Sequence, residues 1–143
     1  MASYAKTKGR ESSKKAELRK SLNGNSFTPL RHDLINSSEF MALSIAAKAV
    51  LVVLLAKYNG YNNGDLSAPQ NRAKEIFGLS PRTLKLALDE LVDKNFLIIT
   101  RQGGKNQCTL YALTCFKLNT ITKNNVDIVK ETFRPLDSWK TQN

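Results

Sequence analysis

The segment Gly78-Leu79-Ser80-Pro81 constrains the fold of this 143-residue chain most strongly, because it ends one helix and begins another within four residues. Glycine readily adopts the left-handed conformation that ends a helix. Serine is a favoured N-cap, and proline fits the first helical position, where its missing N–H is no loss. The segment therefore predicts two helices joined by a tight turn, the second running from Pro81 to about Asn95.

The two helices are expected to pack through apolar faces. In the second helix, Leu84, Leu88 and Leu91 recur at spacings of four and three residues, which places them on one side. The first helix is expected to begin near Ser67, because Ser67 and Gln70 have the spacing of a capping box. Its inward-facing residues are then Ala73, Ile76 and Phe77.

A third helical segment precedes these two and is apolar almost all round. It runs from about Ser44 to Tyr58 and contains the longest apolar run of the chain, the eight residues from Ala49 to Ala56. A membrane-spanning helix needs about 20 such residues. A helix of this kind normally forms the buried centre of a small domain, although surplus apolar surface could also serve a dimer. We expect it to form the core.

A β-hairpin is expected directly after the helices. Residues 96–101 are rich in β-branched and aromatic side chains, residues 102–106 have turn chemistry, and residues 107–113 alternate polar and apolar side chains. The order of elements predicts a mainly α fold with a small β-hairpin. A helix-turn-helix followed by a hairpin forms a winged helix, whose second helix can enter a DNA major groove.

Four stretches of the sequence carry a resemblance to a known family. They are Leu43-Ser44, the segment YNGYNNG at 58–64, the segment GLSPRTL at 78–84 and the segment LYALT at 110–114. Over about residues 28–116 the chain resembles the bacterial winged helix-turn-helix DNA-binding proteins, in particular the small ones of phages, plasmids and other mobile elements. The resemblance implies binding of double-stranded DNA, usually as a dimer on a repeated or palindromic site.

The resemblance also implies which residues touch DNA. Ser80, Arg82, Thr83 and Lys85 fall where the family's recognition helix meets the duplex, and residues 103–106 fall at its wing tip. The chemistry agrees, because an arginine can bond both acceptors of a guanine edge and a capped helix N-terminus attracts phosphate. The remaining candidates are Leu86, which could touch a thymine methyl group, and Arg101, Gly103, Gly104, Lys105 and Asn106 of the hairpin.

Acidic side chains limit how this helix can dock. Asp89, Glu90 and Asp93 occupy its second half, and carboxylates beside phosphates are repelled. We therefore expect the helix to meet DNA by its N-terminal end.

The net charge of +10 is concentrated near the N-terminus, since residues 1–32 hold eight basic and only two acidic side chains. Residues 1–27 are poor in apolar side chains and are expected to form a flexible basic arm. The stop at Gly24 allows a short helix from Ser12 to Asn23 within it. Its candidate phosphate contacts are Lys14, Lys15, Arg19 and Lys20.

Residues 28–118 are expected to form the winged-helix domain and residues 119–143 a C-terminal extension. In the extension, Val126, Val129 and Phe133 recur at helical spacing, which favours a short helix. Leu136 and Trp139 add further apolar side chains. These side chains either pack back onto the domain or pair with a second copy or another partner, and the sequence leaves both alternatives open.

Catalytic and cofactor chemistry are not expected. One histidine and two cysteines provide too few ligands for a zinc site. Cys108 and Cys115 are seven residues apart in a predicted strand segment, so they should face opposite sides and form no internal disulfide. The sequence has no secretory signal and no membrane span, which favours a cytoplasmic protein.

The leading hypothesis is a sequence-specific regulator that binds double-stranded DNA, most simply a repressor linked to a mobile element and acting as a homodimer. A plasmid or phage replication or partition protein that binds repeated sites is an alternative with the same chemistry. An alternative of another class is a winged-helix module that binds protein without specific DNA binding. The sequence indicates no operator, regulated gene or small-molecule effector.

Overall fold

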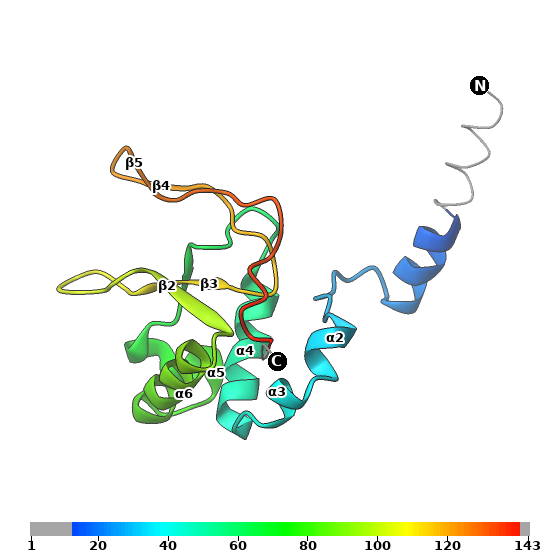
Figure 1. Cartoon of the computed structure of the whole chain (residues 1–143). Helices are drawn as coiled ribbons and strands as arrows, with labels where there is room; N and C mark the ends of the chain where they lie inside the picture. The colour runs from blue at the N-terminus through cyan, green and yellow to red at the C-terminus, as the bar shows by residue number, and fades with distance from the viewer. Residues whose placement is uncertain (1–12, 141–143) are drawn as a thin grey trace.

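The computed structural model describes residues 13–140, which form a mixed fold of helices and small antiparallel sheets (Figure 1). The chain is helical over residues 13–21. The helices that follow are α2 (His32–Ile35), α3 (Ser38–Met41), α4 (Ile45–Lys57), the short 3₁₀ helix η1 (Gln70–Arg72), α5 (Ala73–Phe77) and α6 (Pro81–Asp93). The strands are β1 (Leu66–Ser67), β2 (Leu97–Arg101), β3 (Leu110–Leu113), β4 (Ile121–Lys123) and β5 (Val126–Val129). No helix in this part of the chain is long and apolar enough to cross a membrane.

Helix α4 forms the centre of the main core, as its sequence predicts. Ser44 caps it, accepting a hydrogen bond from the Ala47 backbone N–H. Its buried residues are Ala47, Val50, Leu51, Leu54 and Leu55. Helix α6 packs against it through the predicted leucine face, since Leu84, Leu88 and Leu91 are all buried. Full burial of a leucine side chain contributes about 1.5–3 kcal/mol, so this pairing is a main source of stability.

The turn between α5 and α6 also follows its sequence prediction. Gly78 adopts the left-handed conformation with a φ of 68°, and Ser80 accepts a hydrogen bond from the Thr83 backbone N–H. The predicted start of the preceding helix is wrong. Ser67 lies in β1, where it pairs with Leu110 of β3, so it caps no helix. The helical structure starts later, with η1 and then α5.

A three-stranded antiparallel sheet with the order β1-β3-β2 packs on the helices. Leu97 and Leu113 are paired across β2 and β3 and both point into the main core. The neighbouring pair, Ile98 and Ala112, belongs to a second apolar cluster together with Leu118, Ile121 and Val129. The hairpin of β4 and β5 therefore covers the face of the sheet that points away from the helices.

The short helix predicted for the C-terminal extension is wrong, because Val126 to Val129 form strand β5. Asn124 and Asn125 have φ values of 51° and 64°, the paired left-handed conformations of a tight hairpin turn. Once the chain turns there, Ile121 and Val129 face the sheet and become buried. The burial of Ile121 and Val129 against the sheet thus favours a hairpin over the helix that the spacing of the valines predicts.

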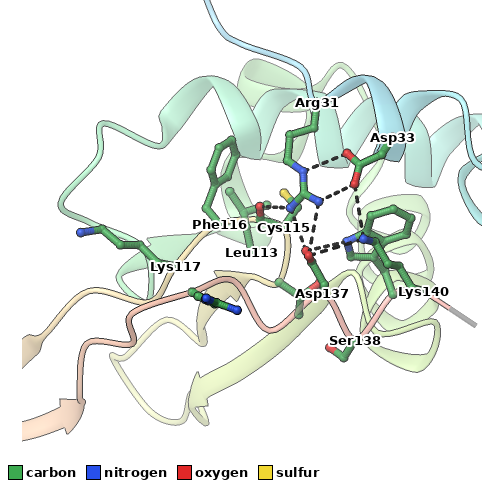
Figure 2. Close-up of polar contacts among 12 residues, drawn as sticks. Arg31, Asp33, Leu113, Cys115, Phe116, Lys117, Asp137, Ser138 and Lys140 are labelled. Atoms are coloured by element: carbon green, nitrogen blue, oxygen red, sulfur yellow. Dashed lines mark hydrogen bonds and ion pairs between the residues drawn. The ribbon is translucent and has the colours of Figure 1, made fainter. Parts of the chain in front are cut away.

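The end of the extension packs back onto the same chain. The Trp139 ring is buried and stacks on that of Phe96, with 6.0 Å between ring centroids. Figure 2 shows how Arg31 links the start of α2 to the C-terminal segment, donating from Nη1 to Asp137 Oδ1 at 2.7 Å and from Nε to Asp33 Oδ1 at 2.9 Å. Of the apolar side chains whose packing the sequence left open, Val129 and Trp139 are buried within the chain, whereas Val126, Phe133 and Leu136 stay exposed.

Candidate nucleic-acid interface

The first turn of α6 places the predicted recognition residues at the surface. Ser80, Arg82 and Lys85 are exposed, and the Leu86 side chain is 60% exposed. Thr83 is half-buried. Helical periodicity explains this arrangement, because the same turn points Leu84 into the core, where it is 0% exposed. The N-terminal end of α6 is therefore accessible to a partner.

The Ser80 cap organises this end of the helix. Its Oγ accepts a hydrogen bond from the Thr83 backbone N–H at 3.2 Å and donates to Thr83 Oγ1 at 2.9 Å. The other N–H groups of a first turn have no partner inside the helix, and the helix dipole gives that end a partial positive charge. The arrangement is suited to an anion such as a phosphate group.

The charged side chains of α6 differ in whether they have an ion-pair or hydrogen-bond partner within the chain. Lys85 Nζ lies 3.1 Å from Asp89 Oδ2, and both side chains are more than half exposed, so the pair is easily separated. Glu90 accepts hydrogen bonds from the backbone N–H of Ser44 at 2.8 Å and from its Oγ at 2.7 Å. Arg82 forms no ion pair or side-chain hydrogen bond with any residue from 13 to 140.

The hairpin loop between β2 and β3 presents two further candidates at its tip. Lys105 and Asn106 are exposed between Gly104 and Gln107, whose backbones pair through N···O distances of 3.2 and 3.1 Å. Asn106 has a φ of 61°. The geometry holds the tip as a tight turn with a cationic side chain directed at solvent.

Arg101 and Gly103 make close contacts within the β2–β3 hairpin. Arg101 Nη2 donates to the Cys108 carbonyl oxygen at 2.9 Å, which ties the two sides of the loop together. A Cβ added to Gly103 would lie 2.6 Å from the Thr109 nitrogen, whereas one added to Gly104 would meet nothing within 4 Å. Close approach at Gly103 is therefore made by the chain's own backbone, and only Gly104 leaves open space for a partner.

A groove beside the hairpin adds residues that the sequence did not indicate. It has a volume of about 540 Å³ and lies between the residues around η1 and the base of the hairpin loop. Its amide side chains are those of Gln70, Asn71 and Gln107. The groove forms only because β1 pairs with β3, which brings residues 68–71 beside residues 103–109. No local sequence pattern signals that approach.

The basic candidates of the N-terminal segment lie elsewhere. Lys14, Lys15, Arg19 and Lys20 are exposed on the helical segment 13–21. That segment stands on one side of α4, whereas α6 and the β2–β3 loop lie on the other (Figure 1). The predicted site residues therefore form two separate groups. The remainder of the predicted arm, residues 1–12, lies outside the described residues.

Both cysteines are free, and they lie in different environments. Cys108 is exposed and Cys115 is buried. Neither lies in a strand, since β3 spans only Leu110–Leu113, so the alternation of faces expected from their spacing does not apply. Burial raises the pKa of the Cys115 thiol to about 12, so the thiol stays protonated at neutral pH. Residues 13–140 contain no group of three or more histidine, cysteine or acidic side chains that could hold a metal ion.

Comparisons with protein-family models, with curated proteins and with solved structures find no match to this chain.

Proposed function

We propose that this chain is a sequence-specific double-stranded DNA-binding protein of the winged helix-turn-helix type, acting as a transcriptional regulator and most simply as a repressor. In this proposal α5 and α6 form the helix-turn-helix, and the β2–β3 hairpin forms the wing. The observation that carries the proposal is the exposed first turn of α6, where Arg82 is unpaired within residues 13–140 and stands next to a serine-capped helix N-terminus.

The first turn of α6 would enter the major groove. The cap and first-turn N–H groups would meet a phosphate, which sets the position of the helix without reading sequence. Arg82 would read a guanine through its two acceptors, a contact that contributes about 1–3 kcal/mol of discrimination. Lys85 would leave its ion pair with Asp89 and bind a phosphate group instead, because an exposed ion pair contributes only about 0–1 kcal/mol to stability.

The acidic half of α6 supports docking by the helix end. Asp89 and Asp93 are exposed beyond the first turn, where a phosphate lying along the helix would be repelled. Glu90 is the exception, since its carboxylate accepts two hydrogen bonds from Ser44 and fixes α6 against α4. Its role is to orient the proposed recognition helix.

The hairpin and the groove beside it would contact the DNA backbone. Lys105 supplies a positive charge at the tip, and the side-chain amides of Gln70, Asn71 and Gln107 can donate hydrogen bonds to phosphate oxygens. These contacts would position the protein without distinguishing one sequence from another.

The test begins with selection of bound fragments from a random duplex library. Affinity is then measured for the selected duplex and for a random duplex, with the wild type and with Arg82→Ala. Loss of a guanine contact should weaken binding to the selected duplex by roughly 5- to 150-fold more than binding to the random one. Arg134→Ala removes an exposed arginine of the C-terminal segment and serves as the matched control.

An Arg82→Ala protein that still distinguishes the two duplexes would contradict the assignment of the recognition helix. Absence of any duplex binding at low salt would contradict the proposed function as a whole. The arrangement of the selected sites also separates two roles, because a single operator fits a regulator and an array of repeated sites fits a replication or partition protein.

A further inference from the structure

A cavity lies between residues of α3, the end of α6 and the last described residues of the chain. Its volume is about 830 Å³, and small-molecule sites in proteins typically have volumes of about 300–1,000 Å³. The buried part of its lining is apolar and consists of Leu43, Phe96 and Trp139, each at most 5% exposed. The candidate nucleic-acid residues do not line it. The cavity is therefore a separate place where a small molecule can bind.

The fold holds one wall of this cavity in place. The Asp137 backbone N–H donates to the Thr114 carbonyl oxygen at 2.8 Å, and Arg31 donates to the Asp137 side chain (Figure 2). The Trp139 ring stacks on Phe96, which directly follows the end of α6. These contacts fix the C-terminal residues beside α6. The cavity is thus present before any ligand binds, which lowers the entropy cost of binding.

The charged side chains that line the cavity are balanced in number. Glu39 and Asp93 are acidic, and Lys94 and Lys140 are basic, so the lining has no net charge in a chain whose net charge is +10. A purely anionic ligand would meet two carboxylates, and a purely cationic one would meet two ammonium groups. A ligand that carries one charge of each sign finds a partner for both.

The end of α6 supplies the charged groups that are available to such a ligand. The side chains of residues 93–95 make no ion pair or hydrogen bond with any residue from 13 to 140. Lys140, by contrast, lies 3.5 Å from Asp33 Oδ2. The C-terminal end of a helix carries a partial negative charge, which disfavours a carboxylate and favours a cation. An ammonium group bound at Asp93 would offset this repulsion.

We propose that the cavity binds a free α-amino acid with a large apolar side chain. Its ammonium group donates to the Asp93 carboxylate, its carboxylate accepts from the Lys94 ammonium group, and its side chain packs against Leu43, Phe96 and Trp139. Because Asp93 and Lys94 are consecutive residues, the two charged groups of the ligand must lie close together. They do so on the single Cα of an amino acid, whereas each further residue of a peptide separates them by up to about 3.3–3.6 Å.

This site and the proposed recognition turn lie at opposite ends of α6. The helix has 13 residues, so the two ends are about 20 Å apart. An amino acid in the cavity therefore touches no residue that the proposed function assigns to DNA. The inference goes beyond DNA binding and does not depend on it. Experiments without DNA test it alone, and a failure of DNA binding leaves their result unaffected.

Calorimetry with free amino acids tests the class of ligand. L-leucine and L-phenylalanine are titrated into the wild type, and at least one should bind with one molecule per chain. The analogues that lack the carboxylate, isoamylamine and phenethylamine, and those that lack the ammonium group, isocaproate and hydrocinnamate, should each bind about 10-fold more weakly or worse. Absence of saturable binding by both amino acids overturns the proposal, as does an analogue that binds equally well.

Two variants test the assignment of the charged groups. Asp93→Asn should weaken binding of the amino acid by about 10-fold or more and remove its advantage over the analogue without an ammonium group. Lys94→Gln should do the same for the analogue without a carboxylate. Asp89→Asn, at an exposed acidic position of α6 outside the cavity, is the matched control and should bind like the wild type. Wild-type affinity in both Asp93→Asn and Lys94→Gln overturns the proposal.

The location is tested by fluorescence and by filling the cavity. Trp139 is the only tryptophan of the chain, so its emission should change with the same dissociation constant as calorimetry gives. Ala42 lines the cavity, is exposed and has an ordinary right-handed backbone with a φ of −76°. Ala42→Phe should therefore keep the melting temperature and abolish binding, whereas Ala49→Phe, at an exposed position of α4 outside the cavity, should bind normally. Binding without a change in emission, or binding by Ala42→Phe at wild-type affinity, overturns the proposed site.

Discussion

Asn63 and Leu113 are joined by two hydrogen bonds across 50 residues of sequence. Asn63 Nδ2 donates to the Leu113 carbonyl oxygen at 2.9 Å, and the Leu113 backbone N–H donates to Asn63 Oδ1 at 2.7 Å. The same Nδ2 lies 2.9 Å from the Lys117 carbonyl oxygen, and the asparagine is fully buried. The asparagine fixes the loop that follows α4 onto the end of β3, and so holds the sheet on the helical core.

Replacing this asparagine should destabilise the fold. Asn63→Ala leaves the Leu113 N–H and two carbonyl groups buried without partners, and each such group costs about 1–3 kcal/mol. We expect the free energy of unfolding to fall by about 3 kcal/mol or more, measured by urea denaturation followed by circular dichroism. Asn71→Ala, at an exposed position, should change it by less than about 0.5 kcal/mol. A loss below about 1 kcal/mol for Asn63→Ala would show that water replaces these bonds.

The two glycines of the hairpin loop should respond differently to alanine. At Gly103 a Cβ would lie 2.6 Å from the Thr109 nitrogen, so the hairpin must distort, whereas at Gly104 it would meet nothing within 4 Å. We expect Gly103→Ala to lower the melting temperature and to weaken duplex binding, and Gly104→Ala to leave the melting temperature nearly unchanged. Thermal unfolding of the two variants side by side is the measurement, and equal melting temperatures would refute the packing at Gly103.

The start of α6 could be predicted from sequence because its determinants are local. Gly78, Ser80 and Pro81 act within a single turn, and the helix then fixes which side chains point outward. The exposure of Arg82 and the burial of Leu84 follow from the same periodicity. The exposed residues of this turn can therefore be predicted without knowing the rest of the fold.

Contacts between distant segments could not be predicted in this way. Ser67 and Gln70 have the spacing of a capping box, but pairing with β3 takes Ser67 into a strand. Val126 and Val129 fit a helix by spacing, but they lie in β5, where Val129 is buried against the outer face of the sheet and Val126 is exposed. The Asn124-Asn125 pair was the signal that could have indicated the hairpin. The groove at Gln70 and the Glu90–Ser44 bonds depend on such contacts as well.

The ion pairs of Arg31 should make the free energy of unfolding depend on pH. The Arg31 guanidinium hydrogen-bonds Asp33 and holds the pKa of that carboxyl at about 2, below the value of about 3.9 in an unfolded chain. Its contribution is therefore present above about pH 4 and is lost as the pH falls toward 2. Asp33→Asn should reduce the fall in stability over this range, measured by urea titrations at several pH values. Asn36→Ala, which changes no titratable group, should keep the wild-type dependence.

The two thiols should differ in reactivity. Cys108 is exposed, whereas burial raises the pKa of the Cys115 thiol to about 12 and leaves almost no thiolate at neutral pH. We expect iodoacetamide to add one label to the native protein and two after unfolding in urea, counted by mass spectrometry. Cys108→Ser should take no label while folded. Rapid double labelling of the native wild type would mean that the region around Cys115 opens readily.

The basic helical segment should strengthen DNA binding without adding specificity. Lys14, Lys15, Arg19 and Lys20 are exposed on the side of α4 away from α6, and residues 25–31, which contain no helix or strand, connect the segment to α2. Replacing all four with glutamine should weaken binding to selected and random duplexes alike. Each lost phosphate contact lowers the slope of log affinity against log salt by about 0.9, so the slope should fall by about 3–4 if all four bind phosphates.

The control for this experiment exchanges Lys94, Lys117, Lys130 and Lys140 for glutamine, which removes the same charge from exposed positions outside the segment. Lys140 lies 3.5 Å from Asp33, so the melting temperature of the control must be checked first. A general effect of net charge would lower both slopes equally, since the long-range field depends on total charge. If the segment contacts DNA directly, the slope of log affinity against log salt falls only for the segment variant and not for the control variant. If the segment variant keeps the wild-type slope, the segment does not touch DNA, and the contacts belong to α6 and the hairpin alone.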